Sequence, residues 1–212
     1  MPQQFNALSP YELLLLYRGD AIGAYGAYEQ AIARCFIQLA KTDHKTGSLI
    51  FFKIVNTRTR LSIMDELLKE QFYPNYKKFW DSAFKHIRDI DHTRNKVVHW
   101  LPISELHVDE KGVASLDSRK SKNCWLQPPD YWQAQKDKKE LSINDILAFR
   151  HKTEYVTKNL DLWHIKVSGD LPDVAKTFSD KFQQSIPYPP PKDHPLYEPV
   201  PVWKNQPQSS RA

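Results

Sequence analysis

Residues 75–100 read NYKKFWDSAFKHIRDIDHTRNKVVHW, and Pro102 follows two residues later. The apolar residues recur with the 3.6-residue period of a helix, so the stretch predicts one long helix that ends before the proline. These residues are Phe79, Trp80, Ala83, Phe84, Ile87, Ile90, Val97 and Val98, with Leu101 just beyond. Their stripe has to be buried against other parts of the chain.

The end of this helix holds a guanidinium, a carboxamide and an imidazole within six residues: Arg94, Asn95 and His99. Arg94 falls on the apolar stripe, where a charge is costly unless it is paired or faces a cleft. Arg88, His92, Asn95 and His99 follow one another at spacings of four, three and four, so they share a different, polar face. Arg94 and His99 point about 140° apart on an ideal helix.

The chain before this helix predicts another long helix. Ser9 and Glu12 form a capping box with Pro10 between them, and apolar residues then run from Leu13 to about Leu39. Small residues recur every four positions in this run, which predicts either close packing against another helix or a break or kink near Gly19. They are Gly19, Gly23, Ala27 and Ala31, with Gly26 beside them.

Glu29 lies on this first helix and has two interpretations, an exposed carboxylate or a partner that faces Arg94 inside the fold. A second amphipathic helix is expected from Ser48 to about Gln71, after a turn at residues 41–47. Lys53, Arg58 and Arg60 lie near its polar side, where they either contact phosphate or face solvent.

After Pro102 the helical period disappears. Residues 103–108 and 113–116 look like two short strands around a turn, within an irregular insertion at about 103–140. Ser142 and Asp145 then cap a final helix that runs to about Ile165, and a shorter helical piece is expected near residues 173–184. Proline is dense from about residue 185, so the tail should be extended or disordered rather than helical.

Cations and aromatic rings occur together within the insertion, at Arg119, Lys120, Lys122 and Trp125. Such a mixture binds single-stranded RNA through backbone charge and base stacking. The alternative is that the aromatic side chains fold the loop back onto the helices.

The composition sets further bounds. A chain of 212 residues that is 41% hydrophobic suffices for one domain with appendages, and it contains no uncharged apolar run long enough to span a membrane. Cys35 and Cys124 are expected to be reduced and buried, and the N-terminus lacks a basic secretion signal, so a cytoplasmic protein is expected. The net charge of +5 favours an acidic partner such as nucleic acid.

The residues at the end of the 75–100 helix suit RNA cleavage without a metal. An imidazole moves protons while a neighbouring guanidinium holds the phosphate, and His99 and Arg94 supply these groups. The alternative is that His99 only caps the helix carbonyls. His86, Asp89, Asp91 and His92 do not converge at a recognised ligand spacing, so neither a metal nor another cofactor is expected.

The motif RNKVVH at residues 94–99 resembles the signature of the HEPN superfamily (higher eukaryotes and prokaryotes nucleotide-binding), in which Arg, often followed by Asn, precedes His by four to six residues. The order of elements is similar too: a first helix bearing Glu29, an amphipathic helix, the motif at the end of a third helix, and a later helix. The resemblance covers residues 8–168 as one helical domain, followed by a C-terminal extension at 169–212.

The resemblance implies an all-α bundle of four to five helices, commonly a homodimer in which two motifs line one cleft. Active members are metal-independent ribonucleases of toxin–antitoxin, abortive-infection and other phage-defence systems, and an antitoxin is a further expected partner. Arg94 and His99 match the catalytic pair and Asn95 the polar residue after Arg, while Glu29, His92 and Arg88 are supporting candidates. His99 is followed by Trp100 and Leu101 instead of the His-x-Tyr of some toxins, and many members bind without cutting.

Overall fold

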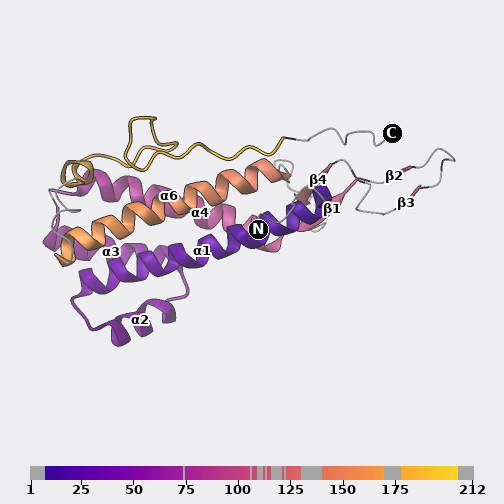
Figure 1. Ribbon diagram of the computed structural model, residues 1–212. Coiled ribbons are helices and arrows are strands. Elements are labelled where there is room, and N and C mark those ends of the chain that lie inside the picture. The colour runs from indigo at the N-terminus through magenta and orange to yellow at the C-terminus, as the bar shows by residue number, and fades with distance from the viewer. Residues whose placement is uncertain are drawn as a thin grey trace, which may run out of the picture. The chain divides into compact units, whose positions relative to one another are not determined.

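The computed structural model describes residues 8–73, 75–105, 107–108, 112, 114–115, 121, 123–129, 140–169 and 178–204. Within these residues the chain forms five α-helices and a small antiparallel sheet, which confirms the predicted helical bundle with a β insertion (Figure 1). The helices are α1 (Pro10–Ala40), α2 (His44–Lys53), α3 (Thr57–Gln71), α4 (Lys77–His99) and α6 (Ile143–Ser168).

The backbone contacts divide the chain into two compact units. The first unit holds residues 1–22, 95–151 and 199–212, and the second holds residues 23–94 and 152–198. Helices α1, α4 and α6 each contribute residues to both units.

Two capping boxes form as the sequence predicts. The Ser9 amide and hydroxyl each donate to the Glu12 carboxylate at 2.8 Å, and the Glu12 amide donates to Ser9 Oγ at 3.3 Å. Ser142 and Asp145 repeat this exchange at the start of α6. Each box satisfies amides that the first helical turn would otherwise leave without partners.

The expected single helix from Ser48 to Gln71 is wrong, because the chain forms α2 and α3 with a break at Ile54–Asn56. Asp43 caps α2 by accepting a hydrogen bond from the Thr46 amide, and Asn56 caps α3 by accepting one from the Thr59 amide. A side chain that accepts from a backbone amide favours a new helix start over continuation of the old one. The break divides the expected helix into two shorter ones.

Helix α1 is one helix of 31 residues, without the expected break near Gly19. The expected close packing of its small residues is wrong at Gly19, Gly23 and Gly26, since no other part of the described structure lies within 4 Å of where a Cβ would sit. Gly19, Gly23 and Ala27 are exposed, and of the four-residue repeat only Ala31 is buried. This stripe of α1 is therefore exposed from Gly19 to Ala27 and buried only at Ala31.

The core of the second unit is built on large rings. Trp80 of α4 meets Trp163 of α6 with ring centroids 4.8 Å apart, and both are fully buried. Phe79 meets Phe182, which belongs to a short 3-10 helix at Ser179–Gln183, with centroids 5.2 Å apart. The chain beyond α6 therefore contributes to the core.

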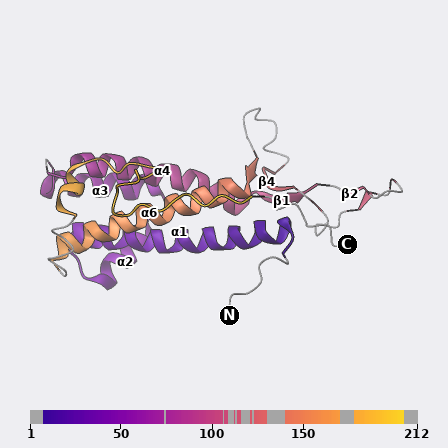
Figure 2. The ribbon, with the colours of Figure 1, turned by 45° about the horizontal axis from the view of Figure 1, so that its top comes forward.

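The proline-rich segment contains no α-helix in its described part, residues 184–204, as predicted. It is nevertheless held by specific contacts. Ile186 is buried, its amide donates to Ser82 Oγ at 2.8 Å, and its carbonyl lies 3.0 Å from His86 Nε2. The segment runs along α6, where His194 packs on Tyr155 (Figure 2). The tail is thus extended but docked.

A three-stranded antiparallel sheet lies in the first unit, in the order β1 (Leu101–Ser104), β4 (Cys124–Gln127) and β5 (Leu141–Ser142). Strands β2 (His107–Val108) and β3 (Ala114–Ser115) form the short pair expected after Pro102, whereas the three-stranded sheet was not expected. Of the short helical piece expected near residues 173–184, residues 173–177 lie outside the described residues, and the described remainder contains the 3-10 helix at Ser179–Gln183.

None of the helices in the described residues is both long enough and apolar enough to cross a membrane.

Candidate functional site

The motif Arg94–His99 occupies the last six residues of α4, as the sequence predicts. Ile87, Ile90 and Val97 are buried on the inward stripe of the helix, and Arg94 on the same stripe is partly buried. The polar face is exposed at each of its expected members, Arg88, His92, Asn95 and His99. Leu101, expected at the end of the apolar stripe, is instead 53% exposed and begins β1.

Arg94 lies against the ring of Tyr25 from α1, with its Cζ atom 5.3 Å from the ring centroid. The Tyr25 hydroxyl donates to Asp91 Oδ1 at 3.0 Å. Burial, followed by the negative charges of Asp91 and Glu29, raises the pKa of Tyr25, while the positive charge of Arg94 acts in the opposite direction. The guanidinium therefore lies at the α1–α4 contact, over an aromatic ring whose hydroxyl is bonded to a carboxylate.

Glu29 is half-buried and forms an ion pair with Arg60 of α3, at 3.3 Å between Oε1 and Nη1. Arg60 also donates from Nε to the Ile54 carbonyl at 2.5 Å and stacks over the ring of Phe51 at 4.4 Å. The interpretation that Arg60 lies on the polar side of its helix is wrong, because this side chain points inward. Lys53 and Arg58 are exposed.

The carbonyls at the end of α4 have a partner that the sequence did not reveal. Arg18 of α1 donates from Nε to the Val97 carbonyl at 2.8 Å and from Nη2 to the Val98 carbonyl at 2.7 Å. A cation in this position satisfies carbonyls that have no partner within the helix and opposes the negative end of the helix dipole. Arg18 thus holds the backbone that leads directly into His99.

His99 itself is exposed, whereas the side chain of the next residue, Trp100, is buried and fixes the backbone there. The Lys96 ammonium lies 5.5 Å from the Trp100 ring centroid. Asn95 precedes His99 by one helical turn, so the two side chains leave the helix from the same exposed face. An imidazole in this position is accessible to a ligand.

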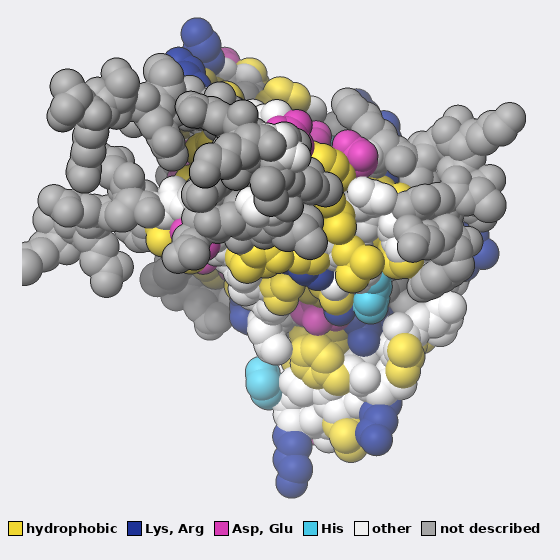
Figure 3. Space-filling model, turned by 90° about the vertical axis from the view of Figure 1, so that its right-hand side faces the viewer, with side chains coloured by type: hydrophobic (Ala, Val, Ile, Leu, Met, Phe, Trp, Pro, Cys, Tyr) yellow, Lys and Arg dark blue, Asp and Glu magenta, His cyan; other side chains and the backbone are white. Residues whose placement is uncertain are grey.

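The RNA-binding candidates of the insertion are only partly described. Trp125 lies in β4, where its Nε1 donates to Gln127 Oε1 at 3.4 Å. Arg119, Lys120 and Lys122 lie outside the described residues. On the face shown in Figure 3, the described Lys, Arg and His side chains lie among hydrophobic, acidic and uncharged ones.

Both cysteines are free and buried, as the sequence predicts. Burial raises the pKa of the Cys124 thiol to about 11 and also raises that of Cys35, so neither is an activated nucleophile. Within the described part of the chain, no three His, Cys, Asp or Glu side chains are grouped so that they could hold a metal ion.

Comparisons of the chain with protein-family models, with curated proteins and with solved structures find no match.

Proposed function

We propose that the chain is a metal-independent endoribonuclease of the HEPN type, in which Arg94 and His99 act on RNA at a cleft between two copies. The observation that carries the proposal is the exposed imidazole of His99 at the end of α4, on the same face as Asn95. The anchored backbone supports it, because Arg18 and the buried Trp100 hold the residues on either side of His99.

The proposed reaction uses the 2′-hydroxyl of the RNA as the nucleophile. His99 of one copy takes the proton from this hydroxyl, and the oxygen attacks the adjacent phosphorus. The bond from phosphorus to the 5′-oxygen then breaks, and the leaving oxygen takes a proton from His99 of the second copy. The products are a 2′,3′-cyclic phosphate and a free 5′-hydroxyl.

Arg94 supplies the positive charge for the phosphate, since a guanidinium binds two phosphate oxygens at once and stabilises the charge that develops in the transition state. Asn95 orients His99 or the ribose. One helix turns Arg94 and His99 about 140° apart, so the proposal needs two copies of the motif. In this proposal a homodimer acts in the cytoplasm as a toxin or antiviral defence enzyme, controlled by an antitoxin or another protein.

A second candidate function is a non-catalytic module of the same type that binds RNA or another protein. The observation in its favour is the position of Arg94 over Tyr25, near the carboxylate of Asp91, where the guanidinium serves packing and charge balance. In this case His99 is a surface residue at a helix end.

Expression in bacteria separates the two candidates. The ribonuclease predicts that wild-type protein arrests growth and that His99→Ala relieves the arrest at equal protein level. Growth arrest that His99→Ala leaves unchanged would exclude the ribonuclease proposal.

A further inference from the structure

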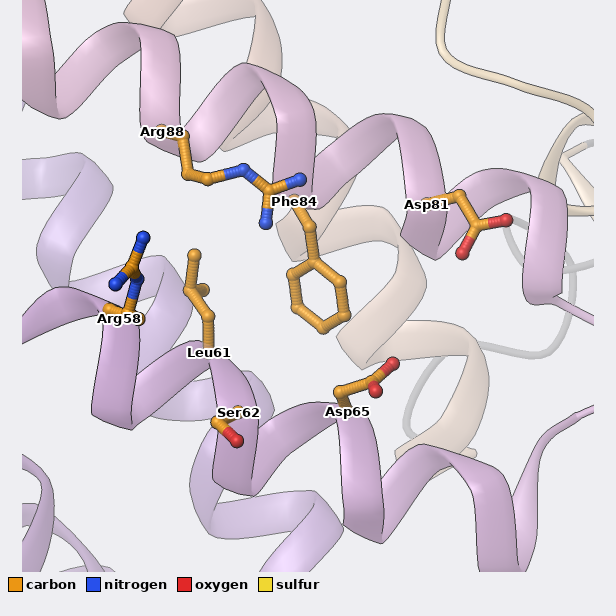
Figure 4. A pocket seen from close by; sticks show the side chains of 7 residues that line it. All are labelled: Arg58, Leu61, Ser62, Asp65, Asp81, Phe84 and Arg88. Atoms are coloured by element: carbon orange, nitrogen blue, oxygen red, sulfur yellow. The ribbon is translucent and has the colours of Figure 1, made fainter.

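A groove of about 630 Å³ lies between α3 and α4, entirely within the second unit (Figure 4). The two helices run antiparallel, so Arg58 near the start of α3 faces the middle of α4, and Asp65 faces the first turns of α4. The groove is lined by Arg58, Leu61, Ser62, Asp65, Asp81, Phe84 and Arg88.

The charges of the groove are separated by sign. Figure 4 shows Arg58 at one end and Asp65 and Asp81 at the other, with Leu61 and Phe84 between them, while the Arg88 side chain extends from α4 along the groove toward Phe84. Arg58 and Asp65 are seven positions apart, as are Asp81 and Arg88, which corresponds to about 10 Å along each helix. The groove is thus lined by two arginines and two aspartates, one of each from either helix.

The acidic end is neutralised by the protein itself. Lys69 Nζ lies 2.8 Å from Asp65 Oδ2, and the Tyr73 hydroxyl donates to Asp65 Oδ1 at 2.8 Å. Asp81 pairs with Lys77 at 2.7 Å. Burial acts to raise the pKa of Asp65, but the hydrogen bonds from Lys69 and Tyr73 outweigh it and lower the pKa. Both carboxylates therefore already have counterions within the protein.

The basic end has no counterion among the described residues. Arg58 and Arg88 are both exposed, and no hydrogen bond or ion pair within the described part of the chain joins either of them to an acidic side chain. Arg58 is also the second residue of α3, at the positive end of the helix dipole. Two guanidiniums and a helix start make this end a site for an anion with several oxygens, and phosphate suits it best.

We propose that this groove binds one nucleotide unit of single-stranded RNA, with the phosphate between Arg58 and Arg88 and the nucleoside along Leu61 and Phe84. A nucleotide carries its charge at one end and neutral hydrogen-bond donors on its base, which matches the charge order of the groove. An acidic peptide matches less well, because its next carboxylate meets Asp65 and Asp81. The choice of RNA rests on the proposed function, but binding here does not require cleavage.

The test measures binding of full-length protein to a fluorescent 2′-O-methyl RNA oligonucleotide, which cannot be cut because its 2′-oxygen is blocked. The double variant Arg58→Ala/Arg88→Ala should lower the affinity about tenfold or more and make binding less dependent on salt. The matched control is Lys45→Ala/Lys53→Ala, which removes two exposed cations from α2 and should change affinity little.

Unchanged binding by the arginine variant, or equal losses in the two double variants, would overturn the proposal. A polyglutamate peptide that displaces the RNA at equal charge concentration would also overturn it, because the groove would then be a peptide site. Thermal unfolding confirms that the variants are folded. The oligonucleotide cannot be cut, so its binding is measured independently of cleavage, and failure of cleavage and failure of the groove are separate results.

Discussion

Arg18 Nη2 donates to the carbonyl of Val98 at 2.7 Å, across 80 positions of sequence, and so ties α1 to the residue before His99. Arg18 Nε also donates to the Val97 carbonyl, so one side chain provides hydrogen-bond donors for two carbonyls in the last turn of α4.

Arg18→Ala should therefore lower the free energy of unfolding by about 2 kcal/mol, because two carbonyls lose a charged donor in a partly buried site. Arg18→Lys should recover part of this loss, since an ammonium retains the charge but not the fork of donors. Urea denaturation provides the measurement. Equal stability of wild type and Arg18→Ala would show that these bonds do not form in solution.

Arg94 offers a second prediction, since its structural and chemical roles can be separated. Arg94→Ala removes the cation over Tyr25 and should lower stability by about 1–2 kcal/mol. Arg94→Lys keeps a cation there but cannot hold a phosphate with two parallel hydrogen bonds. The ribonuclease proposal predicts that Arg94→Lys melts near the wild-type temperature yet loses most RNA cleavage. A stable, fully active Arg94→Lys would count against a phosphate role.

Two buried histidines predict how the docked tail responds to pH. The Ile186 carbonyl can only accept, so His86 donates from Nε2, while its buried Nδ1 has no partner in the described structure. Burial lowers the pKa of both His86 and His194, because it disfavours the charged form of the ring. Below about pH 6.5 these histidines are therefore protonated more readily in the unfolded chain than in the folded one.

Stability should thus be greatest above pH 6.5 and fall as the pH drops below it, by at most about 1.4 kcal/mol per pH unit for each histidine. Hydrogen exchange of residues 184–200 should speed up over the same interval. His86→Gln keeps a neutral donor and should remove part of this dependence. A tail whose exchange, corrected for the intrinsic rate, is the same at pH 5 and pH 7.5 would contradict the prediction.

Replacement of glycine by alanine should have opposite effects on stability at Gly23 and at Gly47. Gly23→Ala on α1 should raise stability by about 0.5–1 kcal/mol, because the site is exposed and has room for a methyl group. Gly47→Ala should lower it by about 1–3 kcal/mol, because the new Cβ would lie 2.6 Å from both Ile37 Cγ1 and Thr42 Cγ2. Thermal unfolding checks both variants. Destabilisation by Gly23→Ala would indicate that another molecule covers α1 in solution.

Local signals predicted much of the fold correctly. The boxes at Ser9–Glu12 and Ser142–Asp145 depend on residues three positions apart, so the sequence alone contains the interaction. The start of α3 was missed although its signal is also local, because the apolar period continues across the cap at Asn56. Periodicity alone did not show that the helix stops at Lys53 and that a new one starts at Thr57.

The surroundings of the candidate site depended on contacts between distant residues. The sequence placed Arg94 on the inward stripe and His99 on the exposed face correctly, because both follow from helix geometry. It could not predict that Arg60 turns inward to Glu29 or that Arg18 caps α4, since these partners are separated by 31 and about 80 positions. From sequence alone, a long basic side chain is assigned to the solvent-facing side of a helix unless its buried partner is known.

The most direct test of the central proposal is RNA cleavage by purified protein in excess EDTA, with the new 3′ ends identified by mass spectrometry. The account predicts fragments ending in 2′,3′-cyclic phosphate for wild type and for His44→Ala, an exposed histidine on α2. It predicts a loss of at least about 100-fold in rate for His99→Ala, in line with removal of a general acid–base group. Cleavage by His99→Ala at the wild-type rate, or no cleavage by wild type, would contradict it.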